Sequence, residues 1–485
     1  MSRSKLVLTT LAASLALAGC GSLGIAIGPD YQRPALETPA TLAAISAHSN
    51  ADTKVDFLSW WKSFQDPVLN SLLDEAAANN QDLLLAAGRI EEARATVSGT
   101  HANRFPVVDA TLSGSKSRTS QNGGKLPAGA KPIAKDFQVG LNASYEIDFW
   151  GKLARADEAS RARLFAQEAN RGLVQSSLYS TLAQNYFALR AFDAQAALSE
   201  SALITRQENL RLQQKRFTAG SVGELELHQA ESEAAAAEIS LAQAKQALAN
   251  TESALAVLLG RSPSSIAQPV IARGSSIDGL YQSLSVPADL PSDLLNRRPD
   301  ILAAEQALVA ANADVGQAKA SYFPSVKLTT GIGDESRVLQ DLFNPASLLW
   351  NVGASLVQPV FRAGAIGAVV AGAEARKTQA LAQYVMTVQG AFREVHDALT
   401  NISASEQIFA ASKRRTIALK DSLRLADLRY KNGYSSYLEV LSAQRDLLQA
   451  EANLIETQKA HLTAVVSLNK AVGGGWEKPA GLAAK

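Results

Sequence analysis

The stretch RYKNGYSSYLEVLSAQR, from Arg429 to Arg445, interrupts a long segment that otherwise has the composition of helix. The earlier stretch RFTAGSVGELELHQAES, from Arg216 to Ser232, is interrupted in the same way. Arg, an aromatic residue and Gly occupy matching places in both, and a Glu follows the Gly by six residues. Glycine commonly follows a helix because it adopts positive φ without steric cost. Each stretch therefore predicts a turn that joins two antiparallel helices.

Within these turns, we expect Gly220 and Gly433 to end the outgoing helices as C′ residues. Hydroxyl side chains cap helix N-termini by accepting hydrogen bonds from free backbone N–H groups. Ser221 in the first turn, and Ser435 and Ser436 in the second, are the expected N-caps of the returning helices. Two ordinary helical hairpins that bind no partner would carry the same signals.

The two stretches belong to a tandem duplication of the chain. Phe105-Pro106 and Phe323-Pro324 are 218 positions apart, whereas Gly220 and Gly433 are 213 positions apart. The same shifts align the apolar and charged residues around each landmark. Both halves therefore have one plan, in which a helix is followed by two strands and a very long helical hairpin.

Each half contains two segments in which apolar and polar residues alternate, which is the pattern of a strand with one apolar face. These segments predict strands at about residues 105–115, 136–148, 323–333 and 348–358. Four strands cannot close a barrel, and an open edge in lipid would leave backbone groups unsatisfied. Two chains would give eight strands and a filled barrel, whereas three would give twelve strands and a lumen. A small soluble sheet with one wet face is the alternative.

Four segments without Pro predict very long helices: residues 152–218, 224–259, 365–431 and 434–472. At 1.5 Å per residue, the first would be on the order of 100 Å long. Apolar residues recur every seven positions, from Leu227 to Leu255 and from Leu441 to Leu462, as in coiled coils. Such helices can wall a tunnel or form a solid rod, and the periodicity does not choose between the two.

The N-terminus has the features of an exported protein. Two basic residues precede an apolar run that ends at Cys20, which predicts a signal peptide at residues 1–19. The sequence LAGC at residues 17–20 resembles the bacterial lipobox, in which the Cys is acylated. Cys20 is the only cysteine, and Gly21 after it favours, by analogy, anchoring at the outer membrane. A chance Cys behind a hydrophobic leader is the alternative.

Composition and motif searches argue against other classes of function. The 47 basic and 46 acidic residues are interspersed and the net charge is +1, so no field suited to nucleic acid is present. The five histidines have no metal-ligand spacing, and no Gly-rich phosphate loop follows a strand. Gly473-Gly474-Gly475 lies at the end of a helical segment, where it is expected to terminate the helix. We expect no enzyme activity, no cofactor, no bound metal and no nucleic-acid partner.

Linear signatures run along nearly the whole chain: GPDYQRP (28–34), WWKSFQDPVLNSLL (60–73), LPSDLLNRRPDI (290–301), SYFPSV (321–326) and AVGGGW (471–476). Their order, with the lipobox in front and the duplication throughout, resembles the outer-membrane factor family of TolC and OprM type channels. Within that family, the resemblance is to the NodT-like lipoprotein branch that serves RND efflux pumps.

The resemblance implies a mainly α chain with membrane β-strands. Such a chain is one third of a trimeric, twelve-stranded β-barrel that continues into a twelve-helix coiled-coil α-barrel. It also implies a bacterial outer-membrane location with the helices extending into the periplasm. The implied partners are two further copies in a homotrimer, a periplasmic adaptor (membrane fusion) protein, an inner-membrane RND pump, and outer-membrane lipid through acylated Cys20.

The duplication and the resemblance together predict how the chain is divided. After the signal peptide, the expected segments are a lipid-anchored equatorial segment (20–78), a first repeat (79–261) with its tip at 217–224, an equatorial linker (262–290), a second repeat (291–472) with its tip at 430–437, and a C-terminal tail (473–485). In this family the two tips lie at the far periplasmic end of the tunnel.

The resemblance places the family's gate on six residues near the tips: Tyr430, Glu226, Leu438, Glu439, Ser442 and Arg445. Tyr430 and Glu226 lie where family members link a Tyr and an Asp of neighbouring helices in the closed state. The adaptor is expected to dock on the turns themselves: Arg216, Gly220, Ser221, Val222, Arg429, Gly433, Tyr434 and Ser435.

The gate of this chain departs from the family at Ser442, which stands where OprM-type members have an Asp. Any acidic ring would then depend on Glu439. We expect three copies of Glu439 to form a cation-binding constriction, by the logic of charged rings in channel filters. An ion pair of Glu439 with Arg445 or Arg429 is the alternative.

Two classes of function follow from these patterns. The first is a passive exit duct of a tripartite RND-type efflux system, which carries small amphiphilic compounds from pump and adaptor to the exterior. The second is a scaffold lipoprotein without a lumen. The strands favour the duct, because a scaffold has no need of membrane-length alternating strands. A type I protein-secretion duct is the runner-up, and the exported compound is expected to be selected by the pump.

Overall fold

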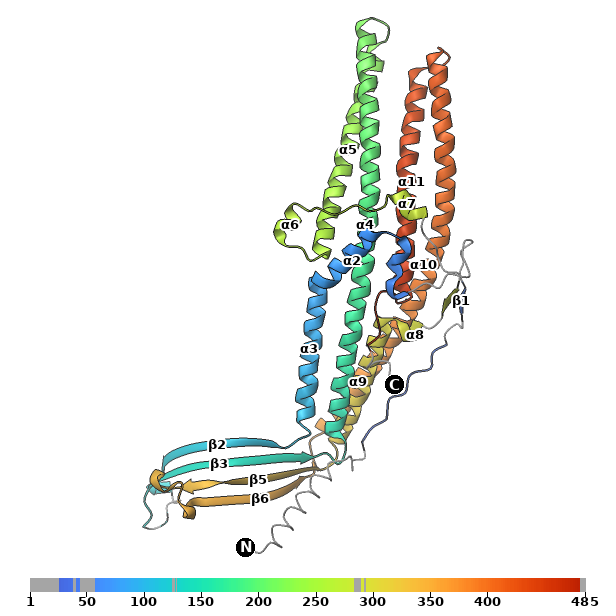
Figure 1. Cartoon of the computed structure of the whole chain (residues 1–485). Coiled ribbons are helices and arrows are strands. Elements are labelled where there is room, and N and C mark those ends of the chain that lie inside the picture. Colours follow the sequence, from blue (N-terminus) through green and yellow to red (C-terminus); the bar gives the residue numbers. More distant parts are fainter. Residues whose placement is uncertain are drawn as a thin grey trace. The chain divides into compact units, whose positions relative to one another are not determined.

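The computed structural model describes residues 26–37, 41–43, 57–123, 127, 129–282, 289–291 and 294–479. The predicted signal peptide and Cys20 lie outside the described residues. The helices are α2 (Pro67–Asn79), α3 (Gln81–Ala102), α4 (Lys152–Thr218), α5 (Glu224–Leu258), α6 (Pro263–Ala267), α7 (Ile277–Gln282), α8 (Leu294–Arg297), α9 (Pro299–Ala320), α10 (Ala365–Lys431) and α11 (Tyr437–Ala471). The strands are β1 (Thr41–Ala43), β2 (Val107–Arg118), β3 (Ile133–Ile147), β4 (Asp289–Pro291), β5 (Ser325–Ser336) and β6 (Leu348–Val357). Four 3₁₀ turns are η1 (Phe57–Phe64), η2 (Gln121–Gly123), η3 (Leu339–Asp341) and η4 (Pro345–Ser347) (Figure 1).

The bounds of these elements confirm the tandem duplication. α3 and α9 are 218 residues apart at both ends, and β2 and β5 keep the same spacing. α4 and α10 are 213 residues apart at both ends, as are α5 and α11. Gly151 and Gly364, which precede the long helices and both have positive φ, are also 213 apart. The spacing therefore changes between the two strands of each hairpin.

The first strand of each hairpin starts two residues later than the alternation alone suggests. β2 begins at Val107 and β5 at Ser325, directly after Pro106 in one case and Pro324 in the other. Proline has no N–H to donate to a strand ladder, so pairing begins at the next residue. The prolines thus set where the sheet starts.

The chain forms two compact units, and neither unit is one of the two repeats. One unit comprises Met1–Pro34, Ile90–Ala166 and Ala304–Tyr384, and the other comprises Ala35–Arg89, Gln167–Ala303 and Val385–Lys485. Each repeat contributes a strand pair to the first unit and a helical hairpin to the second. The division is lengthwise because corresponding parts of the repeats pack against each other.

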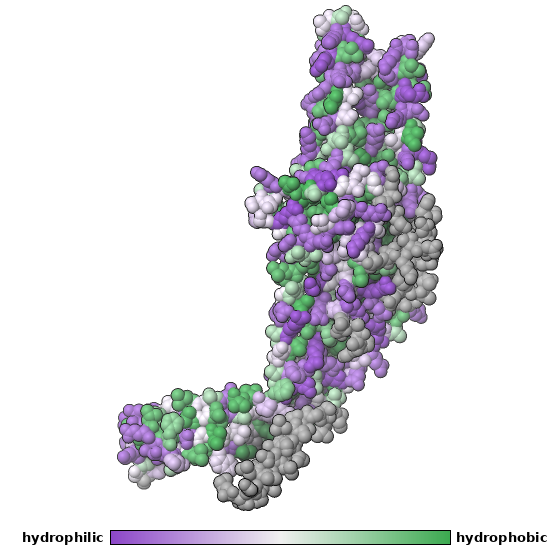
Figure 2. Space-filling model, viewed as in Figure 1, coloured by the Kyte–Doolittle hydropathy of each residue, from purple (hydrophilic) through white to green (hydrophobic). Residues whose placement is uncertain are grey.

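The first unit contains a four-stranded antiparallel sheet in the order β2-β3-β5-β6. Its alternating residues separate an apolar face from a polar one. On the apolar face, Leu112 is 79% exposed, Trp350 71% and Ile332 57%, and Figure 2 shows hydrophobic residues on the side of the sheet in view. Among the described residues, the outer edges of β2 and β6 have no strand partner.

The core of the second unit joins signature motifs that are far apart in sequence. Trp60 and Phe64 of η1 are buried, and the Phe64 ring lies 4.8 Å from the ring of Phe187 in α4. After α11, the backbone N–H of Gly475 donates to the carbonyl of Phe57 at 2.9 Å. Gly473 has a φ of 81° and ends α11, which confirms the predicted terminator.

Gly172, the one glycine of α4, is explained by this core. A Cβ at that position would lie 2.4 Å from the ring of Trp476. The indole N–H of Trp476 donates to the carbonyl of Arg297 at 3.0 Å, which fixes the ring. Glycine therefore allows the C-terminal segment to close onto α4, and the helix continues through it.

A buried carboxylate organises the start of α2. Asp66 is fully buried and its side chain accepts hydrogen bonds from the backbone N–H of Val68 and of Leu69. It also accepts from the hydroxyl of Tyr186 at 2.7 Å and from the N–H of Ser275 at 3.0 Å. A buried charge is tolerated when several donors satisfy it.

The long helices are polar on much of their surface. Within the described residues, none of the helices is both long enough and apolar enough to cross a membrane.

His461 of α11 makes folding stability depend on pH. It is 5% exposed, lies 2.8 Å from the Ser405 hydroxyl, and packs against the ring of Tyr281. Burial lowers the pKa of His461 to about 4, from an ordinary value of 6.5. The unfolded chain therefore takes up this proton first. Stability is fully present above pH 6.5 and falls by up to about 3 kcal/mol as the pH drops to 4.

We expect the thermal midpoint of the helical circular-dichroism signal to fall between pH 6.5 and 4. The fall should be smaller in His461→Gln, which cannot titrate. His396→Gln, a change on α10 outside this contact, is the matched control and should keep the wild-type fall. An equal fall in all three proteins would contradict the assignment to His461.

Candidate functional site

Both turns between the long helices have the same backbone geometry. Gly220 has a φ of 69° and Gly433 a φ of 77°, which confirms both as C′ residues. The N–H of Ser221 donates to the carbonyl of Arg216, and that of Gly220 to Phe217. These two bonds are those of a Schellman motif, and the second turn repeats them. The predicted kinks are thus sharp helix endings that satisfy their own carbonyl groups.

The predicted N-caps are correct for only one of the two returning helices. The N-cap of α5 is Gly223, so the prediction of Ser221 is wrong. The backbone N–H of Gly223 donates to the Glu226 carboxylate at 3.1 Å, which replaces a hydroxyl cap. The N-cap of α11 is Ser436, as predicted, although its hydroxyl makes no capping bond, and Ser435 lies outside the helix.

Tyr430 joins the two hairpins within one chain. Its hydroxyl accepts a hydrogen bond from the guanidinium of Arg216 at 2.7 Å. The Tyr430 ring lies 5.7 Å from that of Tyr437, which belongs to a small buried cluster at the start of α11. The partner of Tyr430 inside the chain is therefore Arg216, while the Glu226 carboxylate bonds to the backbone of its own turn.

The charged residues predicted for the gate pair within the chain. Glu439 lies 3.4 Å from Arg429, with both side chains largely exposed. Arg445 lies 3.0 Å from Glu233 of α5. For Glu439, this geometry favours the ion pair with Arg429 over the pair with Arg445. Exposed ion pairs contribute little, about 0–1 kcal/mol.

Leu438 and Ser442 lie one helical turn apart on the same face of α11. Leu438 is 54% exposed, and Ser442 is also exposed. The opposite face, with Val440 and Leu441, is buried against α10 and its neighbours. The Leu438 face is therefore free, within one chain, to meet a lumen or another copy.

A polar seam between the hairpins was missed by sequence reasoning. Arg206 of α4 is 5% exposed, and its guanidinium donates to the side-chain oxygen of Gln444 in α11. It also lies 3.4 Å from Glu233 of α5, which Arg445 approaches from α11. We call Arg206, Glu233, Gln444 and Arg445 the hairpin seam. Arg206 and Gln213 lie seven residues apart in an Ala-rich helix, and that polar heptad was the available signal.

Two polar groups beside the seam lack hydrogen bonds. The Gln213 side-chain oxygen and the Tyr437 hydroxyl are buried and have no partner among the described residues. Burial raises the pKa of Tyr437 to about 12. Unpaired buried groups of this kind cost about 1–3 kcal/mol each. The packing seen in one chain therefore leaves polar groups available for another arrangement of the helices.

The turn residues predicted for adaptor docking lie mainly at the surface. Tyr434 is 79% exposed, and Gly220, Ser221, Arg429 and Gly433 are exposed as well. The remaining three are half-buried: Arg216, Val222 and Ser435. A partner could reach both turns without unfolding either helix. Among the described residues, no three His, Cys, Asp or Glu side chains are grouped to hold a metal ion.

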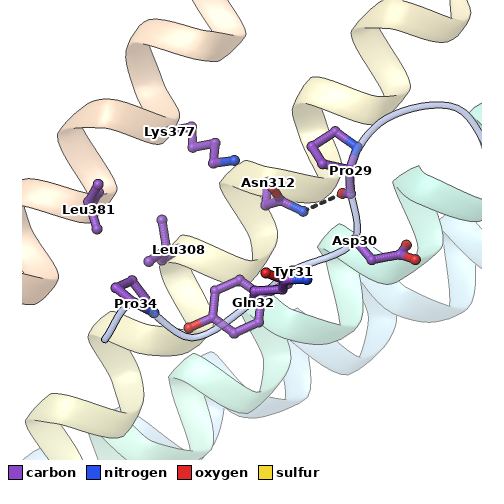
Figure 3. A pocket seen from close by; sticks show the side chains of 9 residues that line it. All are labelled: Pro29, Asp30, Tyr31, Gln32, Pro34, Leu308, Asn312, Lys377 and Leu381. Atoms are coloured by element: carbon purple, nitrogen blue, oxygen red, sulfur yellow. Dashed lines mark hydrogen bonds between the residues drawn. The ribbon is translucent and has the colours of Figure 1, made fainter. Parts of the chain in front are cut away.

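A second structured segment follows the predicted lipidation site. Asn312 of α9 donates to the carbonyl of Pro29 at 2.8 Å, and Arg155 donates to the carboxylate of Asp30 at 2.8 Å. Arg33 binds Glu305 through two hydrogen bonds of 2.5 and 2.6 Å. Figure 3 shows this segment crossing α9 beside a cavity of about 500 Å³. The GPDYQRP signature thus clamps the N-terminal segment onto the first unit.

The chain belongs to the outer membrane efflux protein family, whose family model matches residues 72–261 and 290–474. The cation efflux system protein CusC of Escherichia coli is 36% identical over 466 residues, which are 96% of this chain and 98% of that protein. The solvent efflux pump outer membrane protein SrpC of Pseudomonas putida is 35% identical over 474 residues, or 96% of this chain and 97% of that protein.

Solved channel structures have the same fold. The CmeC outer membrane channel of Campylobacter jejuni matches with a TM-score of 0.87 and 28% identity, covering 94% of this chain and 96% of that chain. A crystal structure of CusC matches with a TM-score of 0.80 and 35% identity over 92% of this chain and 99% of that chain. The predicted family, fold class and function as an efflux exit duct of the outer membrane are therefore confirmed. The relatives are channels and efflux proteins, not enzymes.

We expect the hairpin seam to stabilise the packing of the two hairpins. Arg206→Met should destabilise the protein by about 2–4 kcal/mol, because Glu233 stays partly buried with one cation fewer. Arg211→Met, a change of the same type at an exposed position on α4, is the matched control and should stay within about 0.5 kcal/mol of wild type. Denaturant unfolding in detergent, followed by circular dichroism, measures both. Equal losses in the two variants would contradict a role for the seam.

Proposed function

We propose that three copies of the chain form one continuous exit duct. Their twelve strands close a barrel in the outer membrane, and the long hairpins continue it as an α-barrel in the periplasm. The observation that carries this proposal is the four-stranded sheet with an exposed apolar face and two unpaired outer edges, repeated in a chain with the fold of solved channels. Three copies supply enough strands for a lumen.

We propose that the duct is closed at the turns between the long helices. Arg216 and Tyr430 would hold the two hairpins together at the tips, and the hairpin seam would do so farther along the helices. The exposed Leu438 face of α11 supplies an apolar constriction. Glu439 would add negative charge there when it is released from Arg429, so the cation-binding ring belongs to an opened or loosened state.

A periplasmic adaptor is the proposed partner of both turns, and an inner-membrane RND pump the source of energy. The adaptor would bind the exposed turn residues and separate the hairpins. The unpaired Gln213 and Tyr437 groups support this step, because a shifted arrangement could satisfy them. The turn geometry is identical in the two halves, so the three copies would offer six similar docking positions.

The exported compound is proposed to be a small amphiphile chosen by the pump. Relatives of similar identity are named for cation efflux, solvent efflux and antibiotic efflux. A duct shared by such different substrates is better explained by selection elsewhere in the system. The type I protein-secretion duct and the lumenless scaffold have no comparable support among these relatives.

An acyl anchor at Cys20 is proposed to hold the duct to the outer membrane. A relative from Salmonella typhimurium, 32% identical over 473 residues, is named a probable outer membrane lipoprotein, SilC. The clamped segment after residue 26 would keep the anchor close to the first unit, which contains the sheet. Several acyl chains on one residue would anchor firmly, at about 0.8 kcal/mol per buried CH₂.

Loss of the tip contact should open the duct. In planar bilayers we expect a small wild-type conductance that rises severalfold in the double variant Tyr430→Phe and Arg216→Met, because both sides of the hydrogen bond are removed. Tyr434→Phe changes a neighbouring, exposed tyrosine and should conduct as wild type. Adding Glu226→Gln to Tyr430→Phe tests the predicted link to Glu226 separately. An unchanged conductance in every variant would refute a gate at the tips.

The lipid anchor is tested by labelling. Cells that express the full chain should incorporate palmitate into it, and Cys20→Ser should abolish the label while the duct still reaches the envelope fraction. Because Cys20 is the only cysteine, no other thiol can take up the label. Equal labelling of the two proteins would show that the acyl group is elsewhere.

A further inference from the structure

The two outer edges of the sheet are long and apolar. Val352 and Leu356 of β6 are 76% and 66% exposed, and Leu112 and Val108 of β2 are 79% and 63% exposed. Their backbone groups have no strand partner among the described residues. An edge of this kind is costly in lipid and prone to pair with another chain. The edges must therefore meet a partner with a defined register.

The duplication supplies a template for that register. β3 and β5 come from different repeats, and they pair antiparallel inside the chain. β5 is equivalent to β2, because the two strands are 218 residues apart at both ends. β6 is equivalent to β3 at a spacing of 213: Ser144 pairs with Val107 in one hairpin, and Val357 pairs with Ser325 in the other.

We infer that β6 of one copy pairs with β2 of a second copy in the register of the internal β3–β5 pairing. The internal pair Ala143 and Thr330 then corresponds to Leu356 opposite Leu112 of the second copy. The internal pair Phe137 and Ser336 corresponds to Trp350 opposite Arg118 of the second copy. This inference rests on the proposed assembly of several copies, and it fixes which residues meet at the seam between them.

The inferred register agrees with the chemistry of both faces. Leu356 and Leu112 both lie on the apolar face, and a slip of one residue would place Leu356 opposite Thr111 of the polar face. Trp350 opposite Arg118 places a guanidinium beside an indole ring, a favourable pair. No like charges oppose each other. Pro359, two residues after β6, cannot donate to the ladder, so this seam is expected to end near Val357.

Cysteine cross-linking reads the register directly. Leu356→Cys is combined with each of three changes on β2: Ala110→Cys, Leu112→Cys or Gly114→Cys. All four positions lie on the apolar face, so the three pairs differ only by a slip of two residues. After mild oxidation of membranes, the Leu112 pair should form at least tenfold more covalent dimer and trimer than either shifted pair. Single-cysteine variants control for random collision and for Cys20.

The outcomes separate this inference from the proposed assembly. If a shifted pair cross-links best, the register is wrong and the assembly stands. If native mass shows trimers but no pair links, the β6 and β2 edges do not meet, and the inference fails. If the wild-type chain shows no trimer by native mass, the proposed assembly itself fails, and the seam with it. An internal pair, Leu141→Cys with Ile332→Cys, tests the oxidation without joining copies.

Discussion

The structure depends on one constraint, which is that backbone N–H and C=O groups must be paired wherever water is absent. The sheet meets this constraint internally at three strand pairings and leaves it unmet along the outer edges of β2 and β6. An isolated chain in hydrocarbon would lose several kcal/mol for each unpaired group. Assembly is therefore a requirement of the sheet, and the helices that continue from its strands are brought together by the same closure.

The features that are local in sequence could be predicted. Alternation predicted the strands, the absence of Pro predicted the long helices, and the matched Gly220 and Gly433 predicted two equal turns. The duplication added the order of elements, which sequence periodicity alone does not give. Each of these properties depends on neighbouring residues, so the printed sequence contains it directly.

The features that depend on distant residues could not be predicted in the same way. Glu226 was expected to meet Tyr430, but a nearer donor, the N–H of Gly223, binds it in its own turn. Ser221 was expected to cap α5, but the Schellman motif uses its N–H to end α4, and the helix begins later. Gly172 gave no sign that a tryptophan some three hundred residues away would lie against it. In these cases competition between partners decided the outcome.

The internal duplication also changes how difficult the ring is to assemble. A subunit of half this length, with one hairpin of each kind, would have to bring six copies together and form every contact between separate molecules. In the duplicated chain the β3–β5 contact forms within one molecule. A covalent linker replaces an encounter in solution with a high effective concentration. For a trimer, three contacts of six then become independent of protein abundance, which is an advantage for a channel present in few copies per cell.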